Sequence, residues 1–166
     1  MQLQKRPKLN IPRSKMETLL DIICLLIIIG NVIYIIKMYP SLPNRIPIHF
    51  NGNDVADGWG NKAFVWILPL ITLIIWGGMT ILEKFPHLYN YSNLTERNIE
   101  GQYKNARLMV HIIKAEITIF LAYNSWSWIY SILGTRVGFG IWELLIFIII
   151  MIGTIVFMAL RSARIK

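Results

Sequence analysis

Four apolar runs dominate this sequence, and each is long enough to cross a lipid bilayer as a helix. A transmembrane helix needs about 20 predominantly apolar residues, and the runs cover residues 19–38, 63–82, 108–133 and 139–160. Only 16% of the 166 residues are charged, so little chain remains for a soluble domain. We therefore predict a single domain over residues 1–166, with an all-α integral membrane fold in which four transmembrane helices form a bundle.

The lysines and arginines predict which side of the membrane each connection faces. Twelve of them lie in segments 1–15, 83–107 and 161–166, whereas four lie in segments 37–62 and 134–138. Basic residues are retained on the cytoplasmic side, which predicts that both termini are cytoplasmic. The net charge of +8 is then explained by anionic lipid and insertion topology, and we predict no binding to nucleic acid.

The connection between the first two runs, Leu42–Lys62, is predicted to be an ordered extracytoplasmic loop. Its prolines break any helix, its glycines allow tight turns, and its Asn and Asp side chains can close turns onto their own backbone. It contains His49, Asp54, Asp57 and Trp59. One His and two Asp are too few for a closed zinc site, so we predict neither a metal nor another cofactor.

Two interpretations of this loop remain open. In the first, the loop is shaped to meet a peptide or a lipid headgroup. In the second, it is a self-supporting structural cap, in which His49 bonds a carboxylate or a carbonyl group. Asp57 then caps a turn or the helix that starts near Lys62, and Trp59 lies at the lipid interface.

Ionisable residues inside the apolar runs need partners, because a charged side chain at the centre of a membrane helix costs about 2.5–3.5 kcal/mol. Asp21 and Lys114 lie at similar depths, so we predict that they pair. Glu116 follows Lys114 by two residues and lies on another side of the helix, which is predicted to run from Thr95 through the third run. A proton or ion pathway is the functional interpretation, whereas structural pairing is favoured for all of them except Glu116.

Motifs for catalysis are missing from the sequence. It contains no HExxH, no GxSxG, no phosphate-binding loop and no Cys–His pair, and we predict that the protein is not an enzyme.

A family resemblance is carried by two blocks of the sequence. The first is Leu42-Pro43-x-x-Ile46-Pro47-x-His49-Phe50 followed by Asp57-Gly58-Trp59-Gly60-x-Lys62. The second consists of Tyr89-Asn90-Tyr91, Asn98, Gln102-Tyr103 and Ala106-Arg107. Together they resemble a bacterial membrane domain of unknown function that forms the N-terminal part of SdpI-like proteins, the immunity and signalling proteins for the sporulation-delaying toxin.

The resemblance implies a multi-pass protein of the bacterial plasma membrane that binds or senses a membrane-active peptide or a lipid through its outer loop. His49, Asp57, Trp59 and Lys62 are then the binding residues. The partners are a toxin peptide outside and a regulator inside, the latter reached by Arg97, Lys104 and Arg107. Two alternatives stay open: a small transporter or transporter accessory subunit that uses Glu116 and Lys114, and a lipid-active membrane enzyme with His49 and Asp57 at headgroup level.

Overall fold

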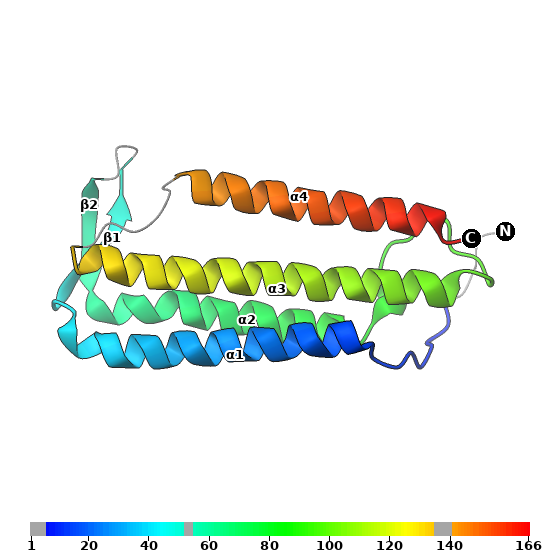
Figure 1. Ribbon diagram of the computed structural model, residues 1–166, viewed down its shortest axis with the longest axis horizontal. Coiled ribbons are helices and arrows are strands. Elements are labelled where there is room, and N and C mark those ends of the chain that lie inside the picture. Colours follow the sequence, from blue (N-terminus) through cyan, green and yellow to red (C-terminus); the bar gives the residue numbers. More distant parts are fainter. Residues whose placement is uncertain (1–5, 52–54, 135–140) are drawn as a thin grey trace.

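The computed structural model describes residues 6–51, 55–134 and 141–166, which form long α-helices and one β-hairpin (Figure 1). In chain order the elements are α1 (Lys15–Met38), η1 (Tyr39–Ser41), β1 (Arg45–Phe50), β2 (Ala56–Asn61), η2 (Lys62–Trp66), α2 (Ile67–Leu82), η3 (Pro86–Leu88), α3 (Ile99–Ile132) and α4 (Ile141–Arg164), the η elements being short 3₁₀ helices. Residues 139–140 of the predicted fourth run lie outside the described residues.

Three helical stretches are long and apolar enough to cross a membrane: Lys15–Ser41, Lys62–Leu82 and Trp142–Arg164. These correspond to the first, second and fourth predicted runs. The third run is helical, as part of α3, but it is not among these stretches. Its half near the N-terminus carries charged residues, and its other half mixes apolar residues with Ser, Asn, Trp and Tyr.

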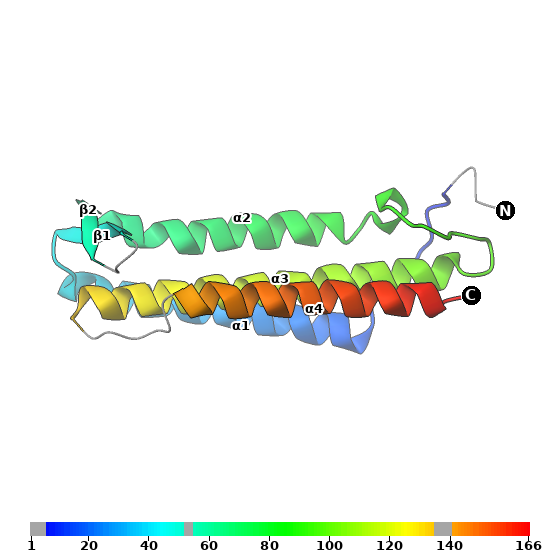
Figure 2. The same cartoon turned by 90° about the horizontal axis from the view of Figure 1, so that it is seen from above.

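Helix α3 lies at the centre, and α1, α2 and α4 are arranged around it (Figures 1 and 2). It packs extensively against each of them, whereas α1 and α2 touch each other much less. The hairpin lies at one end of the long axis. The segment that leads from Arg6 into α1 lies at the opposite end, with the last turn of α4 (Figure 1). We call these the hairpin end and the termini end.

Local hydrogen bonds fix where two of the helices begin. The Ser14 hydroxyl accepts from the Glu17 amide (3.2 Å), and the Glu17 carboxylate accepts from the Ser14 amide (2.6 Å), so a capping box starts α1. Helix α3 begins at Ile99 rather than at the predicted Thr95. The amides of Thr95 and Asn98 each donate to the other's side chain (2.8 and 3.3 Å), which makes a separate turn before the helix.

The predicted loop contains an antiparallel β-hairpin, β1–β2, which the sequence analysis did not anticipate. The composition of this segment does not predict strands, because it is rich in Gly, Pro, Asn and Asp, which are depleted in β-structure. The base of the hairpin is fixed by the apolar side chains of Leu42, Ile46 and Val65, which pack with Ile35 of α1 and Ile129 of α3. Asp54 lies outside the described residues.

Candidate functional site

Two β-bulges shape the hairpin around His49. Pro47 pairs with Trp59, His49 with Gly58 and Phe50 with Ala56, so Ile48 on one strand and Asp57 on the other are extra residues. Bulges redirect side chains, and here Nδ1 of His49 lies 2.5 Å from Oδ1 of Asp57. Of the two predicted kinds of partner for His49, a carboxylate or a carbonyl, the structure therefore shows the carboxylate.

Gly58 and Gly60 belong to the first of the two sequence blocks, and the close approach of the two strands explains why glycine is needed at each position. A Cβ atom on Gly58 would lie 2.8 Å from the Cβ of His49, a separation that real Cβ atoms do not adopt. A Cβ atom on Gly60 would lie 3.0 Å from the Cδ1 atom of Ile48. The glycines on either side of Trp59 therefore leave room for the side chains of β1 across the hairpin.

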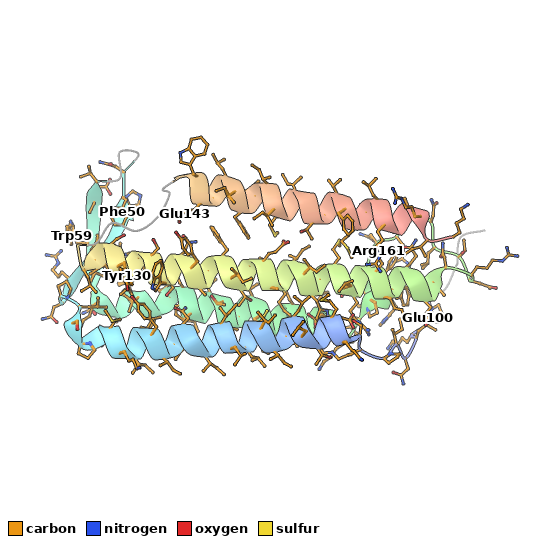
Figure 3. All side chains as sticks on the ribbon, in the orientation of Figure 1. Phe50, Trp59, Glu100, Tyr130, Glu143 and Arg161 are labelled. Atoms are coloured by element: carbon orange, nitrogen blue, oxygen red, sulfur yellow. The ribbon has the colours of Figure 1, made fainter. Side chains whose placement is uncertain are left out.

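The motif side chains are exposed although the base of the hairpin is buried. The side chain of His49 is 71% exposed and that of Asp57 45%, and Trp59 projects at the hairpin end (Figure 3). Lys62 lies with its ammonium 4.8 Å from the ring centre of Tyr39. Asp57 was predicted to cap a turn or the helix that starts near Lys62. The helix alternative is wrong, because Asn61 caps that helix, its side chain accepting from the amide of Ala63 (2.8 Å).

A second group of polar side chains is buried between the helices towards the termini end. Nζ of Lys114 lies 2.6 Å from Oδ1 of Asp21 and 2.5 Å from Oε1 of Glu83. The predicted pairing of Asp21 with Lys114 is thus confirmed. Glu83 was not predicted as a partner. It lies just past the end of an apolar run, a position at which a charged side chain is normally exposed to solvent.

His111 and Arg13 complete this group, which we call the ion cluster. Nδ1 of His111 lies 3.0 Å from the Arg107 carbonyl and therefore donates to it, while Nε2 lies 3.1 Å from Glu83. Arg13 pairs with Asp21, approaches Glu83 at 3.5 Å, and lies 3.3 Å from Nε2 of His111. Its side chain is half exposed, so Arg13 closes the ion cluster on the side facing solvent.

The charges of the ion cluster balance within it. Two carboxylates, Asp21 and Glu83, face the ammonium of Lys114 and the guanidinium of Arg13. Ligand atoms of Asp21, Glu83 and His111 lie within 4.8 Å of one another, a set that suits a divalent cation. Lys114 already holds both carboxylates, however, so a metal ion would have to displace its ammonium. The arrangement fits an internal ion network better than a metal centre.

The N-terminal segment is held across the termini end by Arg107. This guanidinium pairs with Glu17 at 2.7 and 3.0 Å and donates to the carbonyl groups of Ile11 (2.9 Å) and Pro12 (2.8 Å). Arg107 is buried. The prediction that it is available to a partner inside the cell is therefore wrong, because each nitrogen of its guanidinium already donates to a group within the chain. Lys104, by contrast, is exposed and pairs with Glu100.

Other residues of the second sequence block hold the same region together. Arg6 donates to the carbonyl of Tyr89 (2.6 Å), and the Tyr103 hydroxyl donates to that of Pro7 (3.3 Å). The Tyr91 hydroxyl donates to the carbonyl of Pro86 (2.8 Å). The Tyr89 hydroxyl donates to the Leu82 carbonyl (2.8 Å). Burial raises the pKa of Tyr89 to about 12 and also raises that of Tyr91.

The α3–α4 contact has its own polar groups. Gln102 donates to the Ser162 carbonyl (3.0 Å) and Asn105 to that of Met158 (3.1 Å). Further along α3, the carboxylate of Glu116 accepts from the Thr154 hydroxyl at 2.5 Å. Glu116 thus faces α4, whereas Lys114 faces α1 and α2, as their spacing of two residues predicts.

The fold defines a mostly helical protein with three helices able to cross a membrane. The profile of a domain of unknown function, DUF1648, matches residues 26–73, which run from the middle of α1 through the hairpin into α2. No curated protein and no solved structure matches the chain. The prediction of an uncharacterised domain around the hairpin is therefore confirmed, while the relation to SdpI-like proteins in particular stays a prediction.

Proposed function

We propose that this chain is a four-span protein of the bacterial plasma membrane that binds or senses a membrane-active peptide through its hairpin. The observation that carries the proposal is the contrast within the hairpin. Ile46 at its base is fully buried, whereas Trp59 is exposed and His49 and Asp57 are exposed and hydrogen-bonded to each other. A rigid scaffold that presents polar and aromatic side chains is typical of recognition surfaces.

The apolar side chains of the hairpin support a peptide ligand. Phe50, Val55 and Trp59 are 40%, 58% and 54% exposed, beside the polar pair of His49 and Asp57. A membrane-active peptide offers both apolar side chains and charged groups to such a surface. Lipid headgroups are the alternative ligand, since Trp is also enriched at the membrane interface.

Helix α3 is the fourth span of this proposal. It runs alongside three helices that are able to cross a membrane (Figures 1 and 2), and most of its ionisable groups have partners on them. Lys114 and His111 meet carboxylates of α1 and of the end of α2. A helix that is insufficiently apolar alone becomes compatible with the bilayer when its charges pair inside the bundle.

A transport role for the ion cluster has less support. Both of its carboxylates and both of its cations already pair with one another, so carrying an ion through it would require breaking these pairs. We assign the ion cluster the role of fixing α1, α2, α3 and the N-terminal segment, on which the hairpin rests.

Protection against permeabilising peptides tests the recognition role. Cells that express the chain are expected to resist depolarisation by a member of a panel of apolar bacterial peptides, measured with a voltage-sensitive dye. His49→Ala and Asp57→Ala should each lower, about tenfold, the peptide concentration that the cells withstand without depolarising. A tenfold change corresponds to losing roughly 1.4 kcal/mol of binding free energy. Arg45→Gln, an exposed change at the start of β1 and outside the proposed binding surface, is the control. Full protection by both alanine variants at normal expression would refute the role.

The proposed orientation places the hairpin outside and the termini end in the cytoplasm. It rests on the excess of basic residues at the termini end. Single cysteines at Asn51 and Asn93, both exposed positions, distinguish the two orientations once Cys24 has been replaced by Ser. An impermeant thiol reagent on intact cells should label only position 51, whereas labelling only at position 93 would reverse the orientation.

A further inference from the structure

We infer that a pocket at the termini end binds the headgroup of an anionic phospholipid. The pocket lies between the segment that precedes α3 and the last turns of α4 (Figures 1 and 2), and its volume is about 580 Å³. Sites for small molecules have volumes of about 300–1,000 Å³. The inference rests on the proposed membrane arrangement of the helices, which the cysteine labelling tests separately, and it does not depend on what the hairpin binds.

Hydrogen bonds within the chain hold the two walls of the pocket together. The Asn98 side chain donates to the carbonyls of Asn93 (2.9 Å) and Ile165 (3.4 Å). The Gln102 side chain donates to the carbonyl of Ser162 (3.0 Å) and accepts from its hydroxyl (2.6 Å). All five residues line the pocket, so the site is formed before any ligand enters it, and binding does not have to order its walls.

The polar groups around the pocket suit an anion that also carries hydroxyl groups. Lys166 lines the pocket, and the guanidinium of Arg6 lies 5.9 Å from the ring centre of Tyr91, another lining residue. Among the described residues neither cation forms an ion pair, and no acidic side chain lines the pocket. The side chains of Asn90 and Asn93 also line it and have no hydrogen-bond partner in the part of the chain that the structure describes. The two cations can therefore bind a phosphate group, and the two amides can bind hydroxyl groups beside it.

An apolar strip on α4 leads from the pocket towards the middle of the helix. Ala159 lines the pocket, and the strip continues on the same side of α4 at spacings of three and four residues, through Ile155, Ile152 and Ile148. The three isoleucines are 45%, 56% and 42% exposed. From Ala159 to Ile148 the strip is about 16 Å long, roughly half of the 30 Å hydrocarbon thickness of a bilayer. An acyl chain of one leaflet can therefore lie along the strip while its headgroup occupies the pocket.

A phospholipid with a glycerol headgroup, phosphatidylglycerol, meets all of these requirements. Its negative charge matches the two cations, its headgroup hydroxyls match the amides, and an acyl chain matches the strip. A soluble phosphate compound would leave the strip unused, and a zwitterionic lipid would bring a further cation towards Lys166 and Arg6. The bound lipid links the end of α4, which packs mainly on α3, to the N-terminal segment.

Native mass spectrometry of the full chain in a neutral detergent tests the inference. Titration with phosphatidylglycerol should give one tightly bound lipid, whereas phosphatidylcholine, which has no net charge, should leave the site empty at the same concentrations. Lys166→Gln combined with Arg6→Gln should weaken binding of phosphatidylglycerol about 25-fold, since each cation near a lipid phosphate contributes about fivefold. Ala163→Trp, which places a large ring at a position that lines the pocket, should abolish this binding.

Two matched controls separate the pocket from the charge and the apolar surface around it. Lys84→Gln combined with Arg164→Gln also removes two exposed bases of the termini end, but neither lines the pocket, so the affinity should be unchanged. Leu160→Trp adds the same ring as Ala163→Trp at an exposed position outside the pocket, and it should bind the lipid as the wild type does.

Four results would each overturn the inference. These are equal binding of phosphatidylcholine, equal losses in the two double variants, full binding by Ala163→Trp, and displacement of the lipid by glycerol phosphate in solution. Each of them can occur while the chain still labels and protects cells as proposed, so failure of the lipid site is distinct from failure of the proposed function.

Discussion

Lys114→Met is expected to destabilise the folded protein by about 3–5 kcal/mol, because it leaves two buried carboxylates without their shared cation. Lys114 is fully buried and holds both Asp21 and Glu83 within 2.6 Å. Unfolding by increasing denaturing detergent in mixed micelles, followed by circular dichroism, measures the loss.

Removing the carboxylates should restore stability stepwise. Asp21→Asn combined with Lys114→Met should recover part of the loss, and adding Glu83→Gln should recover most of the rest, since no unpaired buried charge then remains among these three positions. Arg13 is half exposed and can return to water. Losses that simply add in the double variant would show that Asp21 and Lys114 do not interact.

Arg107→Met is expected to lower the free energy of unfolding by a similar amount, about 3–5 kcal/mol, because the buried carboxylate of Glu17 loses its cation. It also removes both donors to the carbonyls of Ile11 and Pro12, so the N-terminal segment should detach. Limited proteolysis should then cut between residues 6 and 14 much faster than in the wild type.

Arg107→Lys distinguishes charge from geometry. A lysine keeps the charge but cannot reach the carboxylate and two carbonyls with one planar group, so it should restore only part of the stability. Lys104→Met is the matched control on the same helix. Its exposed pair with Glu100 is worth little, and its effect should stay within about 0.5 kcal/mol. Equal effects of Arg107→Met and Lys104→Met would contradict the assigned role of Arg107.

The apolar runs predicted most of the helices, because length and composition are local properties of the sequence. The pairing of Asp21 with Lys114 was predictable for a related reason, since depth follows from residue counting along a helix. Three of the runs coincide with helices able to cross a membrane. Helix α3 was harder to classify, because its suitability for the bilayer depends on partners supplied by other helices.

Other parts of the site depend on contacts that no local pattern reveals. Glu83 follows an apolar run and reads as a solvated flank, yet the fold turns it back towards Lys114. From the sequence, Arg107 is expected to be one of several exposed basic residues. It is buried because the N-terminal segment passes over it. In the hairpin, a carboxylate or a carbonyl was predicted to bond His49, but the two bulges that bring Asp57 to it depend on strand register.

The central position of α3 affects how the chain assembles during synthesis. In the proposed arrangement α1 and α2 enter the membrane first, with Asp21 and the adjoining Glu83 still lacking Lys114. Helix α3 then brings Lys114, so its insertion and the pairing of these carboxylates with that ammonium occur together. Helix α4 emerges last and packs mainly on α3, so a nascent chain that stalls before α3 holds exposed acidic groups that quality-control proteases can recognise.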